Sequence, residues 1–164
     1  MRLTFWTALL VFLADQASKW IVVHGLNLRQ LAVIDVWPPF LTFRMAWNRG
    51  INFGMLSGFD MRWVLVGVAV AVSLLVLFWV WREGGRRLTY ISAGLLVGGA
   101  LGNAIDRVTY GAVADFINVS CCGFANPYAF NIADIAVFAG AIGLVLFSGT
   151  DTSKPKKPRR RKRS

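Results

Sequence analysis

The stretch WVLVGVAVAVSLLVLFWVW, residues 63–81, contains no charged residue. A helix that crosses a hydrocarbon core about 30 Å thick needs about 20 mostly apolar residues, and this stretch has that length. Trp63, Trp79 and Trp81 lie at its ends, where indole rings favour the membrane interface. The stretch therefore predicts a transmembrane helix.

Three further apolar stretches lie on either side of it: Leu3–Val23, Leu88–Ile105 and Ile132–Phe147, the last of which is short. The whole chain has 164 residues, of which 56% are hydrophobic, and a mean hydropathy of +0.55. That composition is too apolar for a soluble domain of this size. We expect an all-α integral membrane fold with four transmembrane helices, in a single domain over residues 1–150.

The first apolar stretch could be taken for a secretory signal peptide, because Arg2 precedes it. Asp15 and Lys19 interrupt it, however, and no small-residue cleavage site follows before His24. We expect this segment to remain as a permanent helix.

The net charge of +10 is concentrated at the C-terminus. Residues 151–164 are rich in Lys, Arg and Pro and contain no apolar residue, so they are predicted to form a disordered, solvated tail. Such a tail would contact anionic lipid headgroups at most. Nucleic-acid binding is the alternative, but no folded recognition motif supports a nucleic-acid partner.

Positive residues in short loops mark the cytoplasmic side of a membrane protein. They occur here at Arg2, between the second and third helices, and in the tail. Both termini are therefore predicted to be cytoplasmic. Segments 24–62 and 106–131 would then face the opposite compartment, which is the periplasm or exterior in a bacterium.

Segment 24–62 contains a pattern typical of strands. Residues 31–36 are rich in apolar and branched residues, Pro38 and Pro39 break the chain, and Leu41, Phe43 and Met45 alternate with less apolar residues. We expect a small hairpin-like sheet that rests on the membrane surface.

Glycines recur at a spacing of four in the third helix, at Gly94, Gly98 and Gly102. Small residues at this spacing let a neighbouring helix approach closely, so the repeat indicates tight packing and carries no chemistry. Cys121 and Cys122 are adjacent, and neighbouring residues rarely reach disulfide geometry. We therefore expect neither a disulfide nor a metal site there.

Ionisable residues within or beside a membrane are costly, so each needs a reason. Asp15 and Lys19 are four residues apart on one helix face, a spacing that favours mutual neutralisation. A structural pair is at least as well supported as a catalytic role.

Other acids gather at one membrane face: Asp106 ends the third helix, Asp115 lies in the following loop and Asp134 begins the fourth helix. If the flanking helices pack, Asp115 and Asp134 meet near the outer surface. Two close carboxylates hold one proton between them, which provides one acid and one base. That is the chemistry of aspartic proteases.

Each of these residues also has a local structural explanation. Asn131 and Asp134 have the spacing of a helix cap with a favourable first-turn charge, and Asp106 could form a helix-end ion pair with Arg107. The chain has one histidine, no Gly-x-Ser-x-Gly elbow and no metal-ligand cluster, so serine, thiol and zinc hydrolysis are disfavoured.

Two non-hydrolytic functions compete with this interpretation. A proton-coupled carrier would use intramembrane acids, but carriers tend to show internal repeats and groups near the midplane. A membrane scaffold would explain the glycine repeat, but not the convergence of polar residues at one boundary.

Five short motifs give the chain a specific resemblance over nearly its whole length: DQASK at 15–19, NRGINF at 48–53, GGALGNAIDR at 98–107, VADF at 113–116 and FNIAD at 130–134. In this order the chain resembles the lipoprotein signal peptidases, also called signal peptidase II. One departure is Asn52, where the family usually has alanine.

The resemblance implies four membrane helices with a periplasmic β-cradle, in the bacterial cytoplasmic (inner) membrane. It implies that the substrates are prolipoproteins that carry diacylglycerol on the lipobox cysteine, with cleavage just before that cysteine. It also implies contact with membrane lipids, inhibition by the cyclic peptide globomycin, and no metal or organic cofactor.

The resemblance also assigns roles to residues. Asp115 and Asp134 would be catalytic. Asp15, Lys19 and Asp106 would support the site. Residues that would bind the substrate or orient the aspartates are Asn48, Gly50, Asn103, Arg107 and Asn131. Gly50 would permit a backbone conformation that other residues strain.

Overall fold

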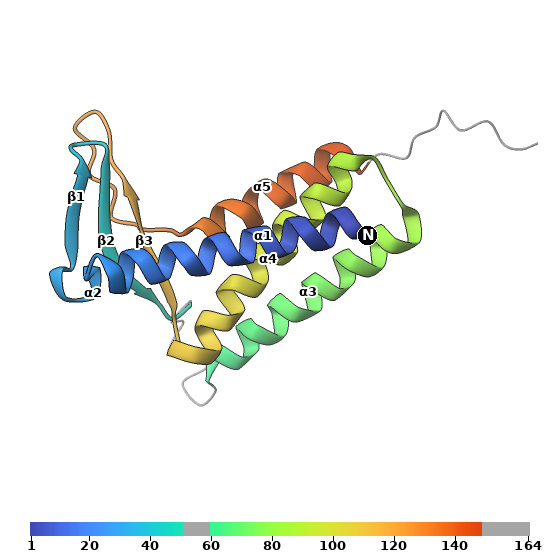
Figure 1. The fold of residues 1–164 in the computed structure, drawn as a ribbon, viewed down its shortest axis with the longest axis horizontal. Helices are drawn as coiled ribbons and strands as arrows, with labels where there is room; N and C mark the ends of the chain where they lie inside the picture. Colours follow the sequence, from blue (N-terminus) through green and yellow to red (C-terminus); the bar gives the residue numbers. More distant parts are fainter. Residues whose placement is uncertain (51–59, 149–164) are drawn as a thin grey trace, which may run out of the picture.

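A bundle of helices carries a small sheet at one end (Figure 1). The structure, a computed structural model, describes residues 1–50 and 60–148. The part of the NRGINF motif that includes Asn52 and the basic tail both lie outside the described residues. The helices of the bundle are α1 (Arg2–Lys19), which continues as the π-helical segment η1 (Trp20–Gly25), α3 (Met61–Glu83), α4 (Arg87–Tyr110) and α5 (Ile132–Phe147).

All four apolar stretches form helices, as predicted. Three helices in the described part of the chain are long and apolar enough to cross a membrane: α1 with η1, α3 and α4. Helix α5 is apolar but has 16 residues, which corresponds to a length of about 24 Å. The fold is therefore mostly helical and suited to a membrane.

The sheet has three antiparallel strands in the order β1-β2-β3: β1 (Val33–Trp37), β2 (Leu41–Asn48) and β3 (Val113–Val119). The predicted hairpin of β1 and β2 is confirmed. Strand β3 corrects the sequence analysis, which placed Asp115 in a loop. Its residues pair with β2, with Ala46 opposite Asp115 and Trp47 opposite Ala114.

One face of the sheet packs on η1 and on the short helix α2 (Leu28–Leu31). The buried cluster contains Val22, Leu28 and Phe116. Phe116 and Phe43 meet edge to face with their ring centroids 5.6 Å apart, a favoured aromatic geometry. This cluster fixes the sheet to the end of α1, and so it fixes the position of β3.

The glycines allow α4 to approach both of its neighbours closely, as predicted. A Cβ atom added at Gly98 would lie 2.5 Å from the carbonyl oxygen of Ala8 in α1. On the other side of α4, a Cβ atom at Gly140 of α5 would lie 2.5 Å from the backbone nitrogen of Leu96. Helix α4 is therefore the central helix, packed between α1 and α5.

The adjacent cysteines differ from the expectation. Cys121 and Cys122 are joined by a disulfide, in a turn where Cys121 pairs with Phe124 and Cys122 has a φ of 58°. The left-handed backbone of this turn brings the two sulfur atoms together.

Candidate active site

Asp115 and Asp134 come from different elements that meet at the sheet end of the bundle. Asp115 lies on β3 and is 3% exposed, whereas Asp134 lies in the first turn of α5 and is half-buried. The Asp115 carboxylate accepts hydrogen bonds from Asn48 Nδ2 at 3.1 Å and from Asn131 Nδ2 at 2.6 Å.

Asn131 contacts both aspartates. Its backbone N–H donates to Asp134 Oδ2 at 3.2 Å, and its Oδ1 accepts from the Asp134 backbone N–H at 2.9 Å. This reciprocal pair is a capping box, so the structural interpretation of Asn131 and Asp134 is correct. The same side chain still donates to Asp115, so capping and orientation of the aspartates coexist.

The Asn103 side chain forms hydrogen bonds with both Asp134 and Asn131. Its Nδ2 donates to Asp134 Oδ1 at 2.8 Å, and its Oδ1 accepts from Asn131 Nδ2 at 3.1 Å. Three asparagines from β2, α4 and the N-cap of α5 therefore hold the two carboxylates in one connected network.

The environment of Asp115 changes its acidity. Burial, and after it the nearby charge of Asp134, raises the pKa of the Asp115 carboxyl from 3.8 to a net value of about 6. The hydrogen bonds from Asn48 and Asn131 and the charge of Lys19 act against this rise. Asp115 therefore keeps its proton at a higher pH than an ordinary aspartate.

Gly50 fixes the orientation of Asn48. Its backbone N–H donates to Asn48 Oδ1 at 3.0 Å, which leaves Asn48 Nδ2 directed at Asp115. Gly50 has a φ of 90°, and a Cβ atom there would lie 2.5 Å from Leu65 Cδ1. The expected special conformation of this glycine is therefore present.

Arg107 and Asp106 do not behave as a simple ion pair at the end of the helix. Arg107 Nη1 donates to the carbonyl oxygen of Asn103 at 3.1 Å, and its Nε is buried without a hydrogen-bond partner among the described residues. Asp106 instead pairs with Lys19, at 2.7 Å. Arg107 and Asp106 are adjacent in sequence but therefore contact different parts of the site.

A buried ionic cluster lies beside Asp115 and Asp134 and consists of Asp15, Lys19 and Asp106. The predicted pairing of Asp15 with Lys19 is present, at 2.7 Å. Gln16 belongs to the DQASK motif but no role was predicted for it, yet its Nε2 donates to Asp15 at 3.1 Å and to Asp106 at 3.0 Å. Its position beside Asp15 in the DQASK motif is the sequence feature that could have indicated these contacts.

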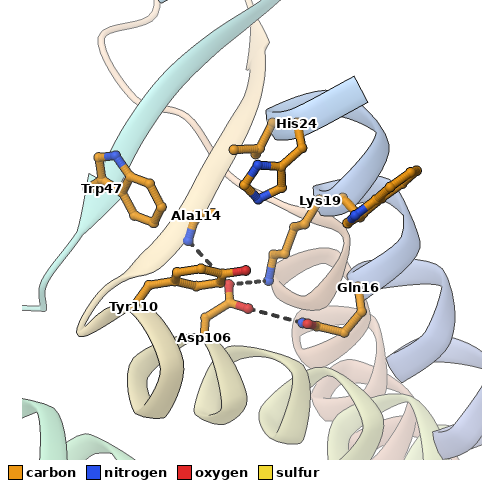
Figure 2. A pocket seen from close by; sticks show the side chains of 9 residues that line it. Gln16, Lys19, His24, Trp47, Asp106, Tyr110 and Ala114 are labelled. Carbon is orange, nitrogen blue, oxygen red and sulfur yellow. Dashed lines mark hydrogen bonds and ion pairs between the residues drawn. The ribbon is translucent and has the colours of Figure 1, made fainter. Parts of the chain in front are cut away.

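Two cavities approach the site from opposite sides. One is a groove of about 250 Å³ between α3, α4 and α5, which is lined mainly by apolar side chains and reaches Asn103 and Arg107. The other, of about 280 Å³, lies between α1, η1, β2, β3 and the end of α4, and Lys19, Asp106 and Ala114 are among its lining residues (Figure 2).

The family model described as signal peptidase (SPase) II matches residues 7–149. The lipoprotein signal peptidase of Methylorubrum extorquens strain PA1 is 44% identical, over 86% of this chain and 82% of the relative. That of Methylobacterium radiotolerans is 42% identical, over 85% of this chain and 81% of the relative. A solved structure described as a bacterial membrane enzyme, at 2.3 Å resolution, matches with a TM-score of 0.70 and 28% identity, over 95% of this chain and 94% of that chain. The chain therefore belongs to the signal peptidase II family: it is a multi-pass bacterial membrane protein and an aspartic peptidase that removes the signal peptide from prolipoproteins.

Proposed function

We propose that Asp115 and Asp134 are the catalytic pair of this peptidase. The observation that carries the proposal is the position of Asn131, which donates one hydrogen bond to each carboxylate, from its side chain to Asp115 and from its backbone to Asp134. One residue that contacts both carboxylates holds them close enough to act on one peptide bond and one water molecule.

The surroundings of the two carboxylates differ, and this assigns their roles. We assign Asp115 as the acid, because burial and the neighbouring Asp134 raise its pKa to about 6 and so favour its protonated form. Asp134 lies at the N-terminus of α5, where the positive end of the helix dipole favours a negative charge, so it is the base. Asp134 takes a proton from water as the water oxygen bonds to the scissile carbonyl carbon, while Asp115 gives its proton to the carbonyl oxygen. The C–N bond of the resulting gem-diol then breaks as Asp134 passes its proton to the leaving nitrogen, and a hydroxyl proton of the diol returns to Asp115.

The groove between α3, α4 and α5 suits a lipid-bearing substrate. Its apolar walls would take acyl chains, and its polar end at Asn103 and Arg107 lies next to the aspartates. The free Nε–H of Arg107 would bind a substrate carbonyl oxygen. We therefore infer that the substrates are diacylglyceryl prolipoproteins and that cleavage falls just before the lipidated cysteine. Inhibition by globomycin follows from family membership.

Helix α5 is proposed as the fourth membrane span. Thr89 Oγ1, near the start of α4, donates to the carbonyl oxygen of Phe147 at the end of α5, at 2.7 Å. At the other end, Asn103 of α4 donates to Asp134 of α5. Helix α5 thus runs antiparallel to the part of α4 between Thr89 and Asn103. Because positively charged loops face the cytoplasm, both termini are cytoplasmic and the aspartates lie at the periplasmic face of the inner membrane.

The test is cleavage of a purified diacylglyceryl prolipoprotein by wild type, Asp115→Asn and Asp134→Asn in detergent, with the folding of each variant checked by thermal unfolding. Each change keeps the size of the side chain but removes the ionisable group. We expect both variants to lose at least about 10²- to 10⁴-fold in kcat, the usual contribution of a general acid or base.

Asp35→Asn is the matched control, because Asp35 is an exposed acid of the same sheet whose carboxylate contacts only Thr42 among the described residues. It should cleave at the wild-type rate. Near-normal turnover by a folded Asp115→Asn or Asp134→Asn would show that the pair is assigned wrongly.

A further inference from the structure

Two carboxylates outside the proposed catalytic pair each hold the backbone next to it. Asp106 Oδ2 accepts a hydrogen bond from the backbone N–H of Ala114 at 3.2 Å, and Asp15 Oδ1 accepts one from the backbone N–H of Ala133 at 3.0 Å. Ala114 directly precedes Asp115, and Ala133 directly precedes Asp134. The same kind of contact thus occurs once for each catalytic aspartate.

Lys19 joins these two carboxylates. Its Nζ lies 2.7 Å from Asp15 Oδ2 and 2.7 Å from Asp106 Oδ2, and the three side chains are 7%, 0% and 1% exposed. Gln16 Nε2 spans the same two carboxylates. Without the ammonium group, two buried negative charges would repel each other and separate.

We infer that Lys19, together with Gln16, is a positioning residue for catalysis: through Asp15 and Asp106 it holds the backbone before each catalytic aspartate and so sets how the two carboxylates face each other. We call Asp15, Gln16, Lys19 and Asp106 the clasp. The inference rests on the proposed function, because it takes Asp115 and Asp134 as the catalytic pair.

The clasp acts on the relative position of β3 and α5, in addition to the hydrogen bond from Asn131 to Asp115 that joins them directly. The Ala114 N–H points away from β2 toward α4, and its bond to Asp106 fixes β3 to the end of that helix. The Ala133 N–H belongs to the first turn of α5, and its bond to Asp15 fixes that turn to α1. A displacement of about 1 Å between reacting groups costs about a hundredfold in rate.

The clasp is reached from a cavity that is separate from the proposed substrate groove. Figure 2 shows Lys19, Asp106 and Gln16 on one side of this cavity of about 280 Å³, with Trp47, Tyr110 and His24 around it. Side chains alternate along a strand, so Ala114 faces this cavity while Asp115 faces the other side of β3. A small amine can therefore reach the position of the Lys19 ammonium without entering the groove.

The experiment is chemical rescue of Lys19→Ala, assayed for prolipoprotein cleavage with and without methylammonium. We expect Lys19→Ala to lose about tenfold to hundredfold in kcat with a smaller change in KM, because the clasp holds the backbone N–H groups of Ala114 and Ala133 and its one contact with the groove is the long hydrogen bond from Lys19 Nζ to Asn103 Oδ1, at 3.5 Å. Methylammonium should restore part of kcat, since it replaces the missing N–H donors and charge. Tetramethylammonium, which has no N–H group, should not do so at equal ionic strength.

Three variants serve as controls. His24 lines the same cavity but makes no contact with the clasp that the structure describes. The variant His24→Ala should therefore show wild-type kcat and no response to methylammonium. Lys19→Arg keeps a positive donor group and should retain more kcat than Lys19→Ala. Asp115→Asn should be inactive with or without the amine.

The outcomes separate the two proposals. If Asp115→Asn is inactive while a folded Lys19→Ala keeps wild-type kcat, or if both ammonium ions act equally, the clasp inference is overturned and the proposed function stands. If Asp115→Asn is active, the proposed function fails. Should Lys19→Ala not fold, Gln16→Leu takes its place: a several-fold loss in kcat at constant KM supports the inference, and an unchanged kcat overturns it.

Discussion

Asn131 uses every hydrogen-bonding group of its side chain. Its Oδ1 accepts from the Asp134 N–H, and the two hydrogens of its Nδ2 go to Asp115 and Asn103. The orientation of the amide is thereby determined, because a flipped amide would direct Oδ1 at a carboxylate. At 0% exposure the residue has no water to compensate for a lost partner.

Replacement of Asn131 by serine or alanine should separate its two roles. Serine caps helices as well as asparagine does but cannot donate to Asp115 and Asn103 together, whereas alanine also loses the cap, at a cost of about 1 kcal/mol. We expect both variants to lose activity and to unfold at a lower temperature, with Asn131→Ala less stable than Asn131→Ser by about the 1 kcal/mol of the lost cap. Wild-type cleavage by Asn131→Ser would mean that the residue is only a cap.

The activity should depend on pH through Asp115. Because its pKa is raised from 3.8 to about 6, Asp115 holds its proton below about pH 6 and loses it above. The acid form disappears as the pH rises, so kcat/KM should fall about tenfold per pH unit on the alkaline side.

Asn48→Ala sharpens this test. The hydrogen bond from Asn48 stabilises the ionised carboxylate, so its removal should raise the pKa of Asp115 further. The alkaline limb of the pH profile should therefore move to higher pH, whatever happens to the maximal rate. A shift to lower pH would contradict the assignment of Asp115 as the acid.

Among the elements, the helices were predictable and β3 was not. A long apolar run without charge has few alternatives to a membrane helix, so residues 63–81 sufficed. Strand β3 contains Asp115 and Asn118 within its seven residues and so lacks a clear apolar alternation. It forms because β2 and Phe130 supply hydrogen bonds on its two sides, and these partners are distant in sequence.

The contacts of the candidate site could also be predicted only in part from the sequence. Spacing within one helix revealed the pair Asp15–Lys19, since residues four apart share a face. Spacing could not reveal that Asp106 pairs with Lys19, nor that Asp15 binds the Ala133 N–H, because these contacts depend on how α1, α4 and α5 pack.

The contact between α4 and α5 should be sensitive to small additions of volume. A Cβ atom at Gly140 would lie 2.5 Å from Leu96 N and 2.6 Å from Ser92 O, which are backbone atoms that cannot move aside. Gly140→Ala should therefore destabilise the protein by about 1–3 kcal/mol, measured by unfolding in mixed detergent.

Gly67→Ala is the control for helix propensity. Nothing lies within 4 Å of a Cβ atom at Gly67, which is also helical, so this change should stabilise the protein by about 0.5–1 kcal/mol. Equal effects of the two substitutions would argue against close packing of α5 on α4.

For the whole molecule, the sheet and the aspartates lie at one end of the bundle, opposite the N-terminus and the connection from α3 to α4 (Figure 1). The positive residues in and beside that connection therefore lie at the end remote from the site; they are Arg82, Arg86 and Arg87. The proposed orientation requires that the positive residues and the aspartates lie at opposite ends of the bundle, as they do.

Reporter fusions test the orientation and the span of α5 together. A reporter fused after Tyr110 should lie in the periplasm, and one fused after Ser164 should lie in the cytoplasm, because α5 reverses the direction of the chain between them. Alkaline phosphatase activity at each fusion point gives the measurement. The same compartment for both fusions would show that α5 does not cross the membrane.

The bond between Asp15 and the Ala133 N–H joins residues 118 positions apart. During biosynthesis α1 enters the bilayer early, with an acid and a lysine that can pair only with each other until the later helices emerge from the ribosome. The last helix delivers both Asp134 and the amide that Asp15 binds. With Asp134 in the proposed catalytic pair, a nascent chain arrested before α5 should therefore be incapable of proteolysis.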